Sequence, residues 1–417
     1  MSKQRWRAGM ALAALTLGAC AGLQVFGQSA AAQAAAKYPT FEVDTTWPKL
    51  PNDWVFGNVS KVVVDRHENV WIIHRPRTVP AGKKAAPAIV ELDANGKFLQ
   101  AWGGPADGYD WPDAEHNVFV DHNDNVYVSG TSPSGQSQTM WSDDMIVKFD
   151  SKGKFIKQLG GRSRNLGSKD PASVNKPGDL FVYPKTNELF VADGYGNRRL
   201  IVFDATTFAY KRMWGAFGNT PEDEPGHSGG RGGNGGPLPI PDPDAKPGAR
   251  GAAPAPVLDT TGLGAPQFGE PVHAVAVSND DLVYTGDRSS RRIQEFTLQG
   301  KYNRQMFINR AGPSGGTVCG FAFSPDAAQE FLYVADYGNS RIAVVDRKKM
   351  EVVYQFGTRG AAPGQFQGVH HIAVDGKGNL YAAEVAPGAR IQKFTFKGFS
   401  DTPPANALTA AQLAPRP

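Results

Sequence analysis

Short runs of β-branched and aromatic residues, each followed by a polar turn, recur along the chain after residue 58. Six of these runs align with one another and begin a repeating unit, at 59–65, 115–121, 177–183, 272–278, 318–324 and 369–375. None of the units shows the 3.6-residue period of an amphipathic helix. The pattern therefore predicts strands in six similar units.

Further strands follow each opening run, as at 188–193, 331–336 and 379–384, and a fourth often ends in an aromatic residue and glycine. Four strands in each of six units predict an all-β, six-bladed β-propeller over residues 37–400, because radial packing leaves only short, protected strand edges. The last unit ends after its third strand. We therefore expect the isolated run 40–44 to supply the missing fourth strand and close the ring.

Most units start 46 to 62 residues apart, but the third and fourth are 95 apart. The excess is residues 219–268, which hold 11 Gly and 10 Pro and are predicted to form a loop. A flexible insertion is favoured over a lid across the mouth of the ring. Residues 401–417 are expected to form a flexible tail.

Residues 1–36 have the composition of an export signal, with basic residues first, an apolar stretch at 8–17 and then an alanine-rich run. Two processing sites compete, because 17–20 resembles a lipoprotein box ending at Cys20, whereas 32–34 fits a small-residue peptidase site. In both cases we expect a periplasmic or secreted protein, with Cys20 as a candidate lipid anchor to the membrane.

Most of the formal net charge of the chain lies in this signal segment. The formal charge is +4, from 44 basic and 40 acidic residues, and residues 1–36 carry three of the basic ones and no acid. The remainder has 41 basic and 40 acidic residues, or +1, which argues against nucleic acid as a partner. We expect a monomer that acts on a small-molecule or peptide-derived substrate.

One position in the first strand of each unit carries unusual chemistry. It lies five residues before the turn and reads Ser60, His116, Gly178, His273, Cys319 and His370. Alternate blades of a six-bladed ring are related by a three-fold rotation, so the three histidines would converge on the central axis. Only 8 of the 417 residues are histidine, so chance seldom produces this column.

Three neutral imidazoles with an open fourth position are typical of a catalytic Zn²⁺ site. Imidazole also suits Fe, Co, Ni and Cu, so the column alone leaves the metal open. The alternative is that these are core histidines bonded to backbone or water. Cys319 is either a further ligand or a small buried hydrophobe.

The position that ends each second strand is acidic in four units, with an arginine nearby, as in Asp193 with Arg198. We interpret these residues as repeated structural ion pairs. Unit one departs from this pattern with His74-Arg75 and has no arginine in its third strand. Arg75 is therefore either available to bind an anion or a surface arginine in a variable loop. Tyr195, in a glycine-flanked turn, is a candidate general base if a metal ion lies beside it.

These residues together resemble a known family. The segments that carry the resemblance are 71–75, 115–117, 191–198, 271–273, 286–288 and 369–370. Over residues 55–398 the chain resembles NHL-repeat propellers and, among them, the catalytic core of peptidyl-α-hydroxyglycine α-amidating lyase. The resemblance implies Zn²⁺ held by His116, His273 and His370, with Arg75 and Tyr195 as catalytic residues. It also implies cleavage of a carbinolamide to an amide and glyoxylate.

Some features depart from that family and leave other functions open. His371 stands where the family has an aspartate that helps to hold a structural Ca²⁺, so this ion is not expected here. The domain that hydroxylates the substrate is absent, which allows a different hydroxylated small molecule. The competing hypotheses are a non-catalytic NHL-repeat binding scaffold and a lactonase-type hydrolase, although the latter would centre acidic residues on Ca²⁺.

Overall fold

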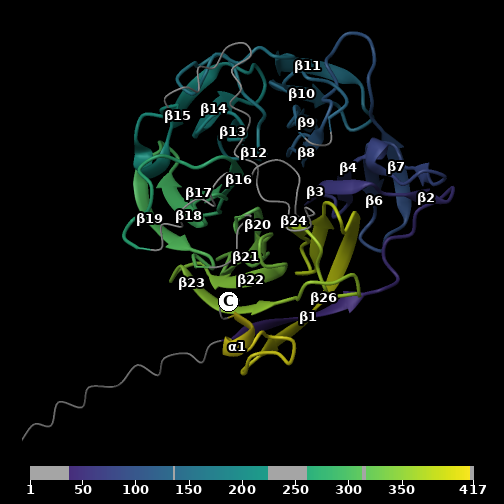
Figure 1. Ribbon diagram of the computed structural model, residues 1–417, viewed down its shortest axis with the longest axis vertical. Coiled ribbons are helices and arrows are strands. Elements are labelled where there is room, and N and C mark those ends of the chain that lie inside the picture. Colours follow the sequence, from purple (N-terminus) through teal and green to yellow (C-terminus); the bar gives the residue numbers. More distant parts are fainter. Residues whose placement is uncertain (1–36, 135–136, 224–260, 312–315, 414–417) are drawn as a thin grey trace, which may run out of the picture. The chain divides into compact units, whose positions relative to one another are not determined.

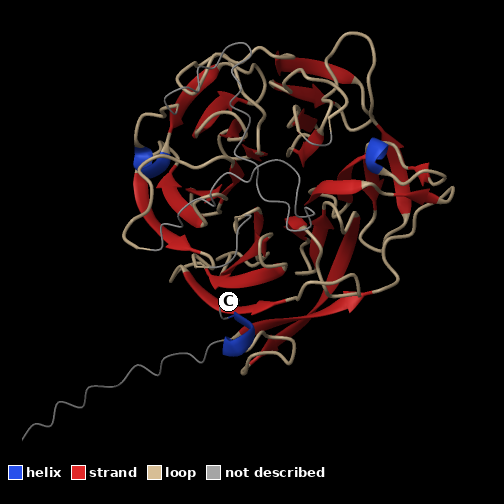
Figure 2. Ribbon diagram, in the orientation of Figure 1, coloured by secondary structure: helices blue, strands red, loops and turns tan. Residues whose placement is uncertain are grey.

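The computed structural model describes residues 37–134, 137–223, 261–311 and 316–413. Within these ranges six four-stranded antiparallel sheets surround a common centre, and helix is limited to three short segments (Figures 1 and 2). The prediction of an all-β, six-bladed propeller is confirmed.

The blades follow one another along the chain, and the first-named strand of each lies nearest the centre of the ring (Figure 1). Blade one consists of β3 (Asn58–Val64), β4 (Val70–Arg75), β6 (Ile89–Leu92) and β7 (Phe98–Trp102). Blade two consists of β8 (Glu115–Val120), β9 (Val126–Gly130), β10 (Met145–Phe149) and β11 (Phe155–Gly160). Blade three consists of β12 (Asp179–Tyr183), β13 (Glu188–Asp193), β14 (Arg199–Asp204) and β15 (Tyr210–Trp214). Blade four consists of β16 (Val272–Val277), β17 (Leu282–Asp287), β18 (Arg292–Thr297) and β19 (Tyr302–Phe307). Blade five consists of β20 (Gly320–Phe323), β21 (Phe331–Asp336), β22 (Arg341–Asp346) and β23 (Glu351–Phe356). Blade six consists of β24 (Val369–Val374), β25 (Leu380–Glu384), β26 (Arg390–Ser400) and β1 (Tyr38–Asp44). The remaining elements are the strand pair β2 (Trp54–Val55) and β5 (Lys84–Ala85), the 3-10 turns η1 (Pro76–Thr78) and η2 (Ala216–Gly218), and α1 (Ala410–Leu413).

The ring is closed by the N-terminal strand, as the sequence predicts. β1 pairs antiparallel with β26, with Phe41 opposite Phe396 and Val43 opposite Phe394. Phe41 also contacts blade five, where its ring lies 5.8 Å from Phe356. The two ends of the propeller are therefore held together by backbone pairing and by an aromatic contact.

The apolar core is divided into six clusters, one between each pair of neighbouring blades. Alternate residues of a strand point to opposite faces, and both faces of each blade are covered by a neighbour. This explains why inner strands such as β4 and β13 are buried at every position and are rich in apolar residues.

The first strand of each blade is irregular at the position that the sequence alignment singled out. In four blades the pairing of the first two strands shifts by one residue, so that Ser60, His116, His273 or His370 is left without a paired residue opposite. In blades three and five the pairing begins one residue after this position. Such bulges re-aim side chains and are common beside active sites.

A buried ion pair spans the axis of the ring. Lys61 of blade one pairs with Asp179 of blade three, and both residues are more than 90% buried. The other carboxylate oxygen of Asp179 accepts a hydrogen bond from the Val275 backbone N–H of blade four, 3.0 Å away. The pair thus links three blades in the centre of the molecule.

Replacing Asp179 with alanine is expected to destabilise the protein by about 3–5 kcal/mol, because it leaves the Lys61 ammonium buried without its counter-charge. Urea unfolding followed by tryptophan fluorescence would measure the change. The double variant Lys61→Met, Asp179→Leu removes both charges and should recover most of the loss. Equal losses in the single and double variants would contradict this role.

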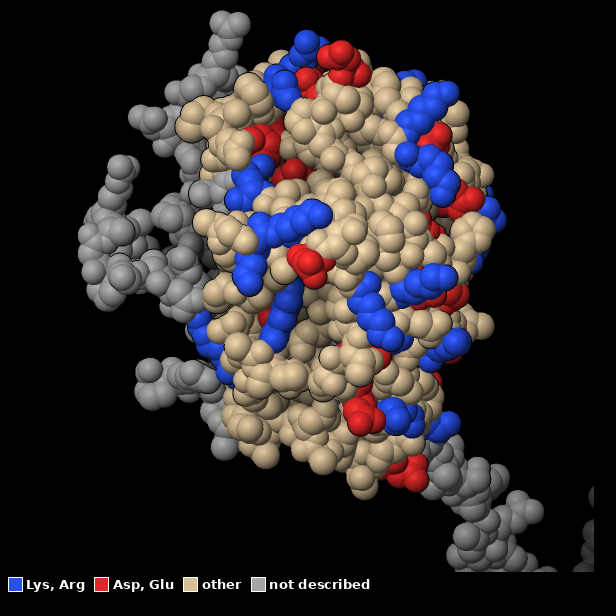
Figure 3. Space-filling view, turned by 90° about the vertical axis from the view of Figure 1, so that its right-hand side faces the viewer, with Lys and Arg blue, Asp and Glu red and all other residues tan. Residues whose placement is uncertain are grey.

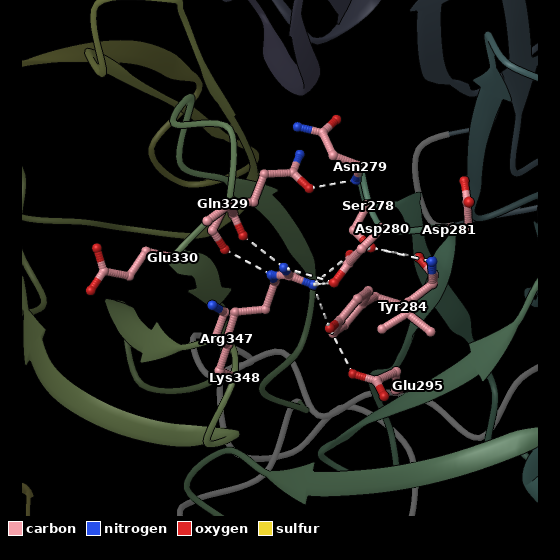
Figure 4. A network of polar contacts seen from close by, with 12 residues as sticks. Ser278, Asn279, Asp280, Asp281, Tyr284, Glu295, Gln329, Glu330, Arg347 and Lys348 are labelled. Atoms are coloured by element: carbon pink, nitrogen blue, oxygen red, sulfur yellow. Dashed lines mark hydrogen bonds and ion pairs between the residues drawn. The ribbon is translucent and has the colours of Figure 1, made fainter.

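Another polar network joins blades four and five. Arg347 is buried, pairs with Asp280 at 2.9 Å and donates to the hydroxyl of Tyr284 at 3.2 Å (Figure 4). The Tyr284 hydroxyl in turn donates to Glu295 over 2.6 Å. Asp280 lies in the turn that follows β16, whereas the histidine column lies at the start of that strand, so the network belongs to the opposite end of the blades from the histidines.

Several predicted segments fall partly or wholly outside the described residues. The signal segment 1–36 with Cys20 and the middle of the insertion, 224–260, are among them. The predicted tail is described as far as Leu413, and two of its residues are hydrogen-bonded to blade five. Leu408 N–H donates to the Gln355 carbonyl over 2.7 Å, and Arg341 donates to the Gln412 carbonyl over 2.6 Å. These bonds tie the segment to β22 and β23.

Within the described part of the chain, no helix has the length and apolar character that crossing a membrane requires. On the face shown in Figure 3, lysine and arginine side chains lie beside aspartate and glutamate. This surface therefore carries both charges side by side.

Candidate metal centre

The three histidines of the column meet in the centre of the ring. One nitrogen of each lies within 4.8 Å of one nitrogen of each other ring, and all three residues are at most 4% exposed. The ring centroids are 4.6–5.1 Å apart, and the ring planes are close to perpendicular, at 76–84°. Perpendicular rings at this spacing can aim three nitrogens at one point.

Two of the histidines are oriented by backbone carbonyls of the next blade around the ring. His273 Nδ1 is hydrogen-bonded to the Cys319 carbonyl, and His370 Nδ1 lies 2.7 Å from the Ser60 carbonyl. A carbonyl can only accept, so Nδ1 carries the hydrogen and Nε2 keeps its lone pair. This is the arrangement that a metal-binding histidine requires.

His116 has a different environment from the other two histidines. Its Nε2 lies 3.2 Å from the Tyr195 hydroxyl, and its buried Nδ1 has no hydrogen-bond partner among the described residues. Since buried polar atoms are usually satisfied, one nitrogen of this ring is available to a ligand.

The protonation state of the three histidines suits metal binding. Burial lowers the pKa of His116, His273 and His370 well below 6.5, and their mutual proximity and nearby cationic residues add to the shift. All three imidazoles are therefore neutral at physiological pH and offer lone pairs. Three neutral nitrogen donors fit Zn²⁺ or another divalent transition metal.

Tyr195 lies directly against this cluster. Its hydroxyl is 2.9 Å from His273 Nε2 and 3.2 Å from His116 Nε2. The glycines on either side allow this approach, since a Cβ at Gly194 would lie 2.0 Å from the Val272 carbonyl and one at Gly196 would lie 2.2 Å from Asn175. The glycine-flanked turn seen in the sequence therefore places the phenol beside two of the histidines.

An ion pair holds the start of this turn, although not the pair that the sequence suggested. Asp193 pairs with Arg199 over 2.9 Å, and both side chains are fully buried. Arg198 instead contacts Glu270 at 3.3 Å. The prediction of an Asp193–Arg198 pair is wrong by one residue, because β14 begins at Arg199 and places that residue opposite Asp193.

The phenol of Tyr195 is hard to ionise in the chain alone. Burial raises its pKa to about 12, although the nearby Arg288 and Arg75 act to lower it. The two arginines therefore do not by themselves produce a phenolate near neutral pH. Ionisation at lower pH needs a further positive charge beside the oxygen, as the hypothesis of a neighbouring metal ion supposes.

Arg75 lies at the end of β4 and is buried. Its Nε donates to the Glu115 backbone carbonyl over 2.9 Å, next to His116. The expectation that Arg75 binds an anion stays a prediction. The blade-one turn replaces the acidic partner with a backbone acceptor. Arg75 also interacts electrostatically with Tyr195, which places its charge at the site.

The structure adds Arg288, which sequence reasoning did not assign to the site. Its Nη1 lies 3.3 Å from the Tyr195 hydroxyl, and its guanidinium lies 4.7 Å from the ring centroid of Tyr337. Arg288 lies directly after β17, and Arg75 is the last residue of β4, the equivalent strand of blade one. The two arginines hold equivalent positions in the repeat, and this equivalence could have identified Arg288 as a site residue from the sequence.

Cys319 is buried beside the cluster. Its sulfur is 3.9 Å from His273 Nε2, and burial raises the pKa of the thiol to about 12. The residue also packs in the apolar cluster between blades five and six. The Cys319 backbone carbonyl therefore contacts His273 Nδ1, and the sulfur lies beside Nε2 of the same ring.

The position after the blade-six histidine holds no acid. His371 is buried, and the ion pair of Lys61 and Asp179 lies next to it, with His371 Nε2 4.0 Å from Asp179. Among the described residues, the group of three or more side chains suited to a metal consists of the histidine cluster. The expectation that structural Ca²⁺ is absent at His371 stays a prediction.

Comparisons with known proteins place this geometry in a wider class. The chain is 23% identical to human NHL repeat-containing protein 3 over 372 residues, which is 85% of this chain and 84% of that protein. It is 26% identical to the mouse protein of the same name over 174 residues, which is 39% of this chain and 43% of that protein's length. The chain is therefore similar in sequence to NHL repeat-containing proteins, and its own sheets form a six-bladed β-propeller.

No protein-family model matches the chain. Similar solved structures include a streptogramin B lyase, with a TM-score of 0.45 and 12% identity over 87% of this chain and 98% of that one. A catalytically inactive virginiamycin B lyase from Staphylococcus aureus with quinupristin also has a TM-score of 0.45, with 14% identity over 86% of this chain and 89% of that one.

Proposed function

We propose that the protein is a metal-dependent lyase of the peptidyl-α-hydroxyglycine α-amidating type. The substrate would be a carbinolamide, R-CO-NH-CH(OH)-COO⁻, and the products an amide and glyoxylate. The observation that carries the proposal is the Tyr195 hydroxyl, which lies within 3.2 Å of two of the three clustered histidines and 3.3 Å from Arg288. Two of the clustered imidazoles and a guanidinium thus lie within hydrogen-bond distance of one phenol oxygen, which supports the proposal.

The histidines and the arginines of the site would have separate roles in this reaction. His116, His273 and His370 would hold the metal. When bound, a divalent ion polarises a coordinated oxygen and lowers the pKa of acidic groups beside it. Arg288 and Arg75 would bind the substrate carboxylate or offset negative charge, as guanidinium groups do for carboxylates.

The proton balance of the reaction involves Tyr195 twice. Tyr195 would begin the step as the phenolate, and its oxygen would take the proton of the substrate's α-hydroxyl while the carbonyl of glyoxylate forms and the C–N bond breaks. The electron pair of that bond stays on nitrogen, and the same phenol returns the proton to it. The amide NH₂ and glyoxylate then leave, and Tyr195 recovers its starting state.

The test is to incubate zinc-loaded protein with an N-acyl α-hydroxyglycine and to measure glyoxylate and amide. We expect both products in equal amounts, and we expect chelator-treated protein to form neither above the spontaneous rate. Loaded protein that binds zinc but releases no glyoxylate would contradict the reaction. A protein that binds its partners equally well after chelation would favour the binding scaffold.

A further inference from the structure

A histidine outside the cluster contacts one of its members. His371 Nδ1 lies 2.9 Å from His370 Nδ1 and 3.0 Å from the Ser60 carbonyl, and the residue is 2% exposed. Gly320 of blade five leaves room for it, since a Cβ there would lie 2.9 Å from the Cδ2 atom of His371. The Nδ1 atoms of the two adjacent histidines therefore lie near the same carbonyl oxygen and near each other.

The other side of His371 faces the axial ion pair. Its Nε2 lies 4.0 Å from an Asp179 carboxylate oxygen and has no hydrogen-bond partner among the described residues. The distance is within ion-pair range but longer than a hydrogen bond, so the contact is electrostatic. Lys61 pairs with the other oxygen of the same carboxylate.

These contacts favour one placement of the ring hydrogens. Two Nδ1 atoms 2.9 Å apart attract only if one donates and the other accepts. His370 Nδ1 lies closer to the Ser60 carbonyl, at 2.7 Å, so it is the natural donor to both the carbonyl and His371. His371 then carries its hydrogen on Nε2, facing the Asp179 carboxylate.

The opposite placement is unfavourable at both ends. If both Nδ1 atoms carried hydrogen, the two N–H groups would crowd the same carbonyl, and the Nε2 lone pair of His371 would face a carboxylate oxygen. We infer that His371 is a positioning residue for the metal centre: oriented by Asp179, it accepts from His370 Nδ1 and so holds His370 Nε2 unprotonated and correctly aimed. The inference rests on the metal site of the proposed function.

The experiment compares zinc affinities, measured by competition with a chromophoric chelator, in four proteins. His371→Gln places its amide near the Nε2 position and loses the contact with His370, whereas His371→Asn places an oxygen near the Nδ1 position and keeps it. We expect His371→Gln and His371→Leu to weaken zinc binding by about 10–100-fold, as loss of such outer contacts does. We expect His371→Asn to stay within about 3-fold of the wild type.

A matched control is Lys148→Met, which disturbs a buried lysine bonded to the Ala205 carbonyl over 2.9 Å at the other end of blade two. It should leave zinc affinity unchanged. Equal affinities in all the His371 variants and the wild type would overturn the inference and leave the metal site standing. Equal weakening in the Asn and Gln variants would also overturn it, because a lost acceptor would not explain the result. A wild type without zinc would overturn the proposed function and the inference together.

Discussion

Replacing His273 with alanine is expected to leave the protein without stoichiometric metal and to reduce glyoxylate release to the uncatalysed rate. The cluster has three nitrogen donors within 4.8 Å of one another, and an open site with two remaining donors binds zinc far more weakly. Loss of an outer contact already weakens such sites by about 10–100-fold, so loss of a ligand should exceed that range.

Metal content by mass spectrometry of purified protein would check this result. His74→Ala is a suitable control, because His74 is equally buried but bonds to the Gly57 N–H and the Pro87 carbonyl, away from the cluster. It should retain the metal. A His273→Ala protein with its full metal content would show that the histidine cluster is not the metal site.

Replacing Tyr195 with phenylalanine is expected to lower kcat by about 10²–10⁴-fold, the usual contribution of a positioned general acid or base. The change removes one oxygen that lies between two of the histidines and Arg288 and keeps the ring. Because no proposed metal ligand is lost, metal content should remain that of the wild type. Steady-state kinetics with the N-acyl α-hydroxyglycine would measure the effect.

Tyr127→Phe provides the comparison. Tyr127 is fully buried, and its hydroxyl donates to Asp121 and to the Ala205 carbonyl over 3.0 Å, far along the blade from the histidines. This variant should lose some stability and keep its kcat. A Tyr195→Phe protein within about 3-fold of wild-type kcat would exclude the phenol as the proton carrier.

The number of blades and the closure of the ring could be predicted because both depend on patterns of residues within short segments of the chain. Every unit needs apolar residues on both faces of its inner strands, so the repeat is visible without tertiary information, and the run at 40–44 matches the strand that the sixth unit lacks. The extent of the tail could not be predicted in this way. Its contacts with Gln355 and Arg341 depend on which blade lies beside it.

Part of the candidate site could also be predicted. Equivalent strand positions lie at equal height in a ring of repeats, so three histidines in alternate units were expected to converge, and they do. Arg288 was not predicted because its contact with Tyr195 joins blade four to blade three and arises only in the folded ring. The partner of Asp193 was misjudged by one residue because strand register is set by pairing and is not visible in composition.

The amino-acid sequence alone specified six four-stranded blades, the closing strand and the histidine column, since alternation and repetition need only local residues. The bulges that free Ser60, His116, His273 and His370 from pairing arise only when two strands come together. The same holds for Tyr195 between two imidazoles and for the Lys61–Asp179 pair across the axis. Hydrogen bonds and ion pairs depend on positions in three dimensions to within a few tenths of an ångström, and only the folded ring sets those positions.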